Sequence, residues 1–143
     1  MRGHHHPKDD GRTAAHPAAT AEHPLVAVGI GGRLELTDGS IRIIKGGVMS
    51  HAVAFLWLSH GMIEKRIALA RVTSVEIVTP TFLPAFIRVT YAGSPPQTGR
   101  YLADSLAENA LVMNFVDNRT FYEIAKRIER AIAISGRSET SKT

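Results

Sequence analysis

The sequence predicts a mainly β domain that ends in a single C-terminal helix. Between about residues 25 and 116, short apolar segments alternate with turns rich in glycine, proline and aspartate, which is typical of tandem antiparallel strands. Residues 120–134 instead repeat apolar side chains at helical spacing. Strands do not alternate with helices, so a parallel nucleotide-binding sheet is not expected. We expect about seven strands in a bent antiparallel sheet or open barrel that the helix caps.

Composition divides the chain into three parts. Residues 1–24 hold five of the seven histidines and almost no large apolar side chains, so we expect a disordered arm. Its triplet His4-His5-His6 is interpreted as part of a tag or as a low-complexity tract, without a metal site. Residues 25–134 are long enough to bury one core, and residues 135–143 form a polar tail. Since cysteine is absent, disulfides and thiolate metal sites are excluded.

The first strand pair is indicated by Asp38-Gly39, which lies between two alternating segments. Asp-Gly favours a two-residue type I′ turn, because both residues tolerate positive φ. That turn would set Glu35 opposite Arg42, an opposite-charge pair on the exposed face. The same register places four apolar side chains on the other face: Leu34, Leu36, Ile41 and Ile43.

The remaining strands are bounded by glycine, proline or short polar connections. Residues 25–30 are expected to be extended, with a break at Gly31-Gly32. Further strands are predicted at 64–68, 72–78, 86–91, 100–103 and 110–116. A tight connection is expected at Ala70-Arg71, an exposed loop at 92–99 and a turn at 104–109. In residues 72–78, Val75 and Ile77 alternate with an outward-pointing Glu76.

The C-terminal helix is predicted to begin near Thr120, whose spacing from Glu123 is that of a capping box. Its apolar stripe comprises Phe121, Ile124, Ala125, Ile128, Ala131 and Ile132. Glu123 can pair with Arg127 one turn later, and Gly136 is a plausible end. We expect this stripe to cover the open end of the barrel, with Met113 and Phe115 beneath it.

Five sequence blocks resemble those of bacterial pleckstrin-homology-like domains, of the type found with a short C-terminal oligomerisation module. The blocks are GRLEL at 32–36, IRI at 41–43, EKRIALARVTSV at 64–75, FIRV at 86–89 and ENALVMNF at 108–115. The resemblance covers residues 32–134 and implies a seven-stranded, strongly bent barrel capped by the helix. We expect this oligomerisation module to be absent here, because only about nine polar residues follow the predicted helix. Lipid-binding members carry a basic loop in the first hairpin, whereas an acidic turn such as Asp38-Gly39 repels phosphates.

Nothing in the sequence predicts a catalytic, cofactor or metal site. Gly29-Ile30-Gly31-Gly32 resembles a fragment of a phosphate loop, but a strand follows it where a helix is needed. The carboxylates mostly alternate with apolar residues, as solvent-facing strand positions do, so an enzyme is not expected. Basic residues are scattered, whereas nucleic-acid binders concentrate them on one face. The longest apolar run, at 52–58, is too short to span a bilayer, and a cytoplasmic protein is expected.

That apolar run is the most suggestive contact element, since it carries the only tryptophan. It is either a loop packed on the core or an exposed patch for a protein partner or a membrane. The candidate contact residues are Phe55, Leu56, Trp57, Leu58, Lys65 and Arg66.

The preferred hypothesis is a non-enzymatic protein-interaction or scaffolding module that can bind a partner or itself. An open strand edge would offer a second route, by addition of a strand. The alternative is a peripheral membrane module, in which Lys45, Lys65 and Arg66 lie near anionic head groups. A small-molecule enzyme is the third hypothesis.

Overall fold

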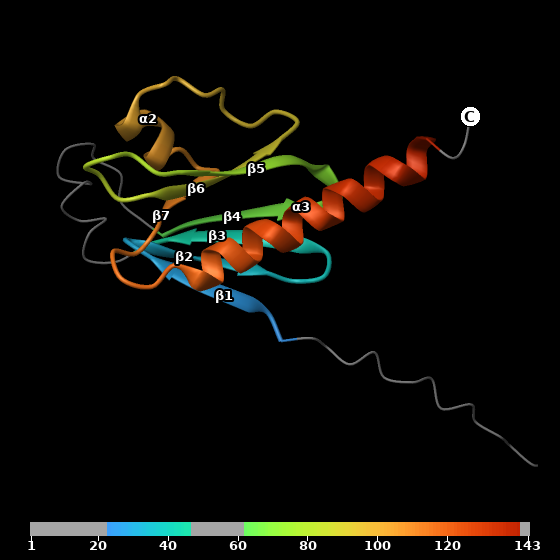
Figure 1. Cartoon of the computed structure of the whole chain (residues 1–143), viewed down its shortest axis with the longest axis horizontal. Helices are drawn as coiled ribbons and strands as arrows, with labels where there is room; N and C mark the ends of the chain where they lie inside the picture. Colours follow the sequence, from blue (N-terminus) through green and yellow to red (C-terminus); the bar gives the residue numbers. More distant parts are fainter. Residues whose placement is uncertain (1–22, 47–61, 141–143) are drawn as a thin grey trace, which may run out of the picture.

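The chain forms two antiparallel sheets and a long C-terminal helix (Figure 1). The computed structural model describes residues 23–46 and 62–140. The first sheet contains, in spatial order, β1 (Leu25–Gly29), β2 (Gly32–Leu36), β3 (Ser40–Lys45) and β4 (Ile63–Ala68). The second contains β5 (Val72–Val78), β6 (Phe86–Tyr91) and β7 (Ala110–Val112). The helices are η1 (Leu69–Arg71, a 3₁₀ turn), α2 (Tyr101–Leu106) and α3 (Arg119–Thr140).

The mainly β class with a terminal helix is confirmed, but the two sheets are not closed into a barrel. They approach each other where the amide of Ile30, in the β1–β2 turn, donates to the carbonyl of Val112 at 2.9 Å. On the other side, β4 and β5 are the last strands of their sheets and are joined through η1. The described strands therefore leave a seam between β4 and β5.

The register of the first hairpin is confirmed, whereas its predicted turn type is wrong. Leu34 faces Ile43 and Glu35 faces Arg42, whose Nη1 donates to the Glu35 carboxylate at 2.9 Å. Among the described glycines, positive φ occurs at Gly31, Gly93 and Gly99, and not at Gly39 as a type I′ turn requires. Register follows from loop length and from burial of one face, so it does not depend on this turn type.

The predicted face of α3 is buried against the core. Phe121, Ile124 and Ile128 are fully buried, Ile132 packs at the margin, and Met113 lies fully buried in the same cluster. The expectation for Phe115 is wrong, because 73% of this residue is exposed. The strand alternation stops at Asn114, whose backbone amide and carbonyl are both bound by the Asn118 side chain, at 2.8 and 2.7 Å.

The predicted start of α3 near Thr120 is confirmed to within one residue, whereas its predicted end at Gly136 is wrong. The helix begins at Arg119, before Thr120, because Asp117 accepts hydrogen bonds from the Arg119 amide and side chain. These bonds, that of the side chain first, lower the pKa of Asp117 to about 2. The helix also continues through Gly136 to Thr140. The predicted pair between Glu123 and Arg127 is confirmed at 3.0 Å.

The second sheet carries a short helix where residues 100–103 were expected to be a strand. In α2, the Asp104 amide bonds to the carbonyl of Arg100, and its carboxylate binds the amides of Thr98 and Gly99. These bonds turn the chain before a strand can form. Tyr101 lies edge-on to Phe86, with ring centroids 5.6 Å apart. Strand β6 is consequently buried on both faces for most of its length.

Candidate functional site

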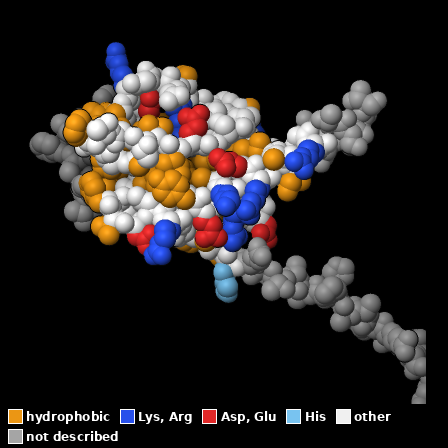
Figure 2. Space-filling view, in the orientation of Figure 1, with side chains coloured by type: hydrophobic (Ala, Val, Ile, Leu, Met, Phe, Trp, Pro, Cys, Tyr) orange, Lys and Arg blue, Asp and Glu red, His pale blue; other side chains and the backbone are white. Residues whose placement is uncertain are grey.

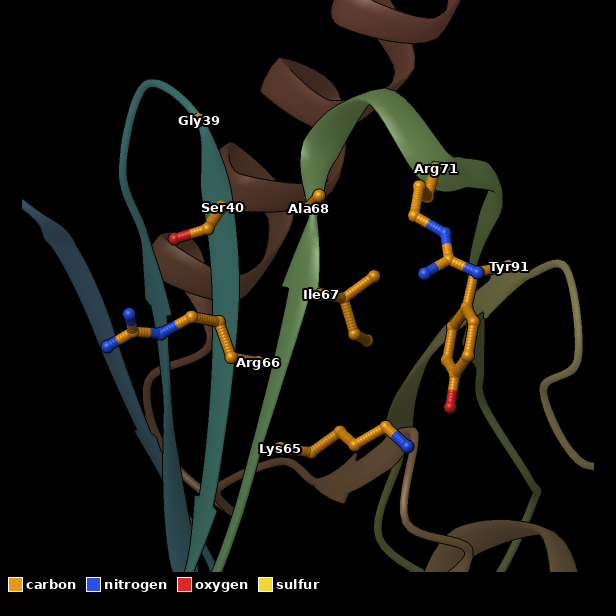
Figure 3. Close-up of a pocket in the computed structure, with 8 residues that line it drawn as sticks. All are labelled: Gly39, Ser40, Lys65, Arg66, Ile67, Ala68, Arg71 and Tyr91. Carbon is orange, nitrogen blue, oxygen red and sulfur yellow. The ribbon is translucent and has the colours of Figure 1, made fainter.

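The seam between β4 and β5 contains a hollow of about 400 Å³ (Figure 3). Three cationic side chains, Lys65, Arg66 and Arg71, and the ring of Tyr91 help to line it. None of the lining residues is acidic. The hollow is therefore a cationic concave feature of the described residues.

Strand alternation decides which of these side chains enters the gap. Lys65 and Ile67 lie on one face of β4 and point toward β5 and β6, whereas Arg66 points to the opposite face (Figure 3). Arg71 ends η1, and Tyr91 ends β6 opposite Val72, so both reach the hollow from its far wall. Lys65 and Arg66, predicted together as contact residues, therefore border the same hollow from two sides of one strand.

Lys65 is held by a small polar network. Its Nζ lies 2.7 Å from Oε1 of Glu108 and 5.3 Å from the ring centroid of Tyr91. The Tyr91 hydroxyl donates to the same carboxylate oxygen at 2.8 Å. The hydrogen bond to Glu108 raises the pKa of Lys65, and the bond from Lys65 lowers the pKa of Glu108. The network keeps Lys65 charged and directed into the gap.

The two arginines are more available than Lys65. Arg66 has a single, long contact to Glu64, at 4.0 Å, and Glu64 is itself bound by Arg42 at 2.8 Å. Arg71 is exposed and has no ion-pair partner among the described residues. The guanidinium of Arg71 is therefore available to pair with an anionic group in the hollow.

Lys45, expected near anionic head groups, is committed elsewhere. Its Nζ donates to the backbone carbonyls of Leu106 and Ala107, just before β7. Burial is the main cause that lowers the pKa of Lys45 to about 8. A partly buried ammonium that is bound to two carbonyls cannot also face a membrane surface.

The opposite end of the molecule is apolar, and hydrogen bonds between loops define it. Gly46 donates to Gly31 at 2.9 Å, and Met113 donates to Ala85 at 2.8 Å. Together with the bond from Ile30 to Val112, these contacts unite the β1–β2 turn, the end of β3, the β5–β6 loop and the β7–α3 loop (Figure 1).

Six large apolar residues of the two loops and of the start of β4, where Met62 lies beside Gly46, are exposed, and we call this set the apolar end. They are Met62, Ile63, Phe82, Leu83, Phe115 and Val116. Phe82 and Val116 are 96% and 93% exposed. Orange side chains gather at this left-hand end in Figure 2.

The predicted contact residues 55–58 lie outside the described residues, so their placement stays a prediction. The described residues that flank the undescribed segment, Gly46 and Met62, lie at the apolar end. Arg71, Tyr91 and Phe82 were not predicted as contact residues. Proline and threonine around Phe82 marked the loop, but only the fold shows that its phenyl ring is left uncovered.

Comparison of the chain with family models, with curated proteins and with solved structures finds no match. Among the described residues, no helix is long and apolar enough to cross a membrane.

Proposed function

We propose that this chain is a non-enzymatic protein-interaction module that binds a protein partner through its apolar end. The observation that carries the proposal is the near-complete exposure of Phe82 and Val116 on two loops that are bonded together at Met113 and Ala85. Burial of apolar surface contributes about 25 cal/mol per Å². Clustered exposed apolar side chains are typical of contact surfaces.

The charges near this end favour a protein over a membrane. Arg119, at the start of α3, is paired with Asp117 at 2.8 Å, and Lys45 is bound to carbonyls. Membrane surfaces recruit proteins through basic residues that are free to approach anionic lipids. Peripheral membrane binding is the second candidate, since an exposed ring such as that of Phe82 can also insert among head groups.

The contact residues predicted from sequence, Phe55 to Leu58, lie in the chain between Gly46 and Met62 and outside the described residues, and their part in this surface stays a prediction.

Site-specific photo-crosslinking tests the proposal. A photoreactive amino acid at Phe82 should capture a protein, which can be a second copy of the chain, in extracts of the native host. The same probe at Leu102, which is exposed on α2, is the matched control. Equal capture at both positions, or none at Phe82, would contradict the proposal.

Vesicle flotation distinguishes peripheral membrane binding, the second candidate, from binding to a protein. Binding to vesicles with anionic lipid that is lost in the Phe82→Ser variant would favour membrane association. Sedimentation over a concentration series identifies self-association, which the same variant should weaken while Leu102→Ser leaves it unchanged.

We also propose that the fold is pleckstrin-homology-like. Support comes from the order of four and then three antiparallel strands followed by a helix whose apolar face enters the core. The open seam between β4 and β5 would then be a local departure from the fully bent barrel. An experimental structure in which α3 leaves the core would contradict this assignment.

A further inference from the structure

The outer edge of β4 carries unpaired backbone groups in the described part of the chain. Leu69 donates to the carbonyl of Gly39, which identifies Gly39–Leu69 as a hydrogen-bonded pair of the β3–β4 ladder. Because such pairs alternate, the backbones of Ile63, Lys65 and Ile67 face β3. The backbones of Glu64, Arg66 and Ala68 therefore point away from β3, and no described strand pairs with them. An edge of this kind is a template for another strand.

The hollow provides space beside this edge. β5 pairs with β6 and does not reach β4, and the hollow of about 400 Å³ lies along the last residues of β4. An added strand needs a spacing of about 4.8 Å from its neighbour. Ile67, Arg71 and Tyr91 would form the wall that its inward side chains contact (Figure 3).

The charges along the hollow specify the chemistry of such a strand. Arg71 has no ion-pair partner among the described residues, and Lys65 extends from β4 into the same gap. Glu108, which already binds Lys65 and Tyr91, is the nearby carboxylate. In an extended peptide every second side chain faces the gap. Acidic residues at these alternate positions would meet Arg71 and Lys65.

From this juxtaposition, among the described residues, of an open edge with an arginine that has no ion-pair partner, we infer that β4 binds an acidic extended peptide as an additional strand. A free phosphate would use the cationic side chains but not the backbone groups of Glu64, Arg66 and Ala68. An added peptide strand would use both the cationic side chains and these backbone groups. Its main-chain hydrogen bonds would give affinity, and its side-chain contacts would give specificity. This inference does not rest on the proposed function, because the hollow adjoins η1 and the apolar end lies at the other end of β4.

The test measures binding of three probes to the full chain. They are an extended peptide of alternating valine and glutamate, a valine–lysine peptide of equal length, and inorganic phosphate. The glutamate peptide should bind. Arg71→Glu should lower the affinity for this peptide by about tenfold or more, which is the loss expected for one charge-assisted hydrogen bond. Arg130→Glu, the same charge change on an exposed face of α3, should have little effect.

A backbone variant separates strand addition from simple ion binding. Ala68 has φ −64° and ψ 130°, which proline adopts without strain, and its amide points away from β3. Ala68→Pro should leave the melting temperature unchanged and should lower the affinity for the glutamate peptide severalfold. The peptide should also slow amide hydrogen exchange at Glu64 and Arg66.

Three results would overturn the inference. One is equal binding of the glutamate and lysine peptides. Another is unchanged affinity in both Arg71→Glu and Ala68→Pro. The third is full competition by phosphate without protection of the β4 amides, which would indicate an anion site instead of a strand-addition site. Variants at Phe82 should not change the affinity for the peptide, so failure here is distinguishable from failure of the proposed function.

Discussion

Arg88 and Asp104 form an ion pair beneath the loop that precedes α2, with Nη1 3.7 Å from Oδ1 and side chains only 3% and 5% exposed. The Asp104 carboxylate also accepts hydrogen bonds from the amide and hydroxyl of Thr98 and from the amide of Gly99, at 2.8 to 2.9 Å. Arg88 Nη2 donates to the carbonyl of Pro95 at 2.6 Å. The pair therefore ties the loop and α2 to the outer face of β6.

Replacement of Arg88 by alanine should strongly destabilise the protein. It removes one partner of a buried pair, and such losses cost about 3–5 kcal/mol because the remaining charge lacks compensation. Urea unfolding measures the change. Arg100→Ala, at an exposed arginine just before α2, is the matched control and should change stability by less than about 0.5 kcal/mol. Similar values for the two variants would contradict a structural role for the pair.

Asp104 should make stability sensitive to acid. Its pKa lies below the ordinary value of 3.8, first because the Thr98 amide donates to the carboxylate. A depressed pKa means that the unfolded chain binds the proton more readily, so this contribution is present above about pH 4 and is lost as the pH falls further. Urea unfolding between neutral and acid pH should show a shallower acid loss in Asp104→Asn. An identical acid profile in the variant would rule out this contribution.

Lys45 should add a second rise of stability with pH, at alkaline pH. Its pKa falls from 10.5 to about 8, chiefly through burial, so the unfolded chain holds the proton more tightly in the interval between these values. The contribution of Lys45 to stability therefore rises as the pH rises from about 8 to about 10.5. NMR titration of the lysine side chains should place the Lys45 midpoint near pH 8 and that of Lys65 above 10.5.

A pair of substitutions checks the origin of this alkaline rise. Lys45→Met should remove it, whereas Lys126→Met, at an exposed position on α3, should preserve it. A Lys45 midpoint near 10.5 would show that the ammonium is solvated and does not lie against the carbonyls of Leu106 and Ala107.

Two glycines should respond differently to alanine. A Cβ added at Gly29 would lie 2.1 Å from the carbonyl oxygen of Val112, so β1 would have to move away from β7. We expect Gly29→Ala to cost about 2 kcal/mol, as overpacking does. At Gly39 nothing lies within 4 Å and φ is not in the left-handed region, so Gly39→Ala should be nearly neutral. Thermal unfolding of the two variants measures the difference. A large loss of stability in Gly39→Ala would indicate that Gly39 needs positive φ, as in a type I′ turn.

Local patterns predicted the elements that depend on local interactions. The pairing of Glu35 with Arg42 followed from a two-residue loop and one apolar face. The buried face of α3, with Phe121 and Ile128, followed from helical spacing. These predictions succeeded because a one-residue slip would expose every core side chain of the element.

The predictions failed where contacts outside the strand itself decide whether a side chain is buried or exposed. Arg88 alternates with Ile87 and Val89 as a solvent-facing residue would, yet α2 and the loop before it bury this side chain. Phe115 continues the alternation of β7, yet the bonds from Asn118 to Asn114 redirect the chain and expose the ring. Neither outcome is encoded in the spacing of the residues themselves.

The candidate surfaces were also only partly predictable from the sequence. Lys65 and Arg66 could be named from the sequence as basic neighbours, but adjacent strand residues point to opposite faces, so the hollow brings Lys65 together with Arg71 and Tyr91 instead.

The sequence by itself determined most of the strands, the hairpin register and the buried face of α3, since periodicity and turn length act over a few residues. Only the tertiary structure decided that, among the described residues, β4 keeps an open edge beside an Arg71 without an ion-pair partner, and that Phe82 and Val116 are left exposed at one end. Those outcomes depend on how two sheets pack, and packing brings together residues far apart in the chain.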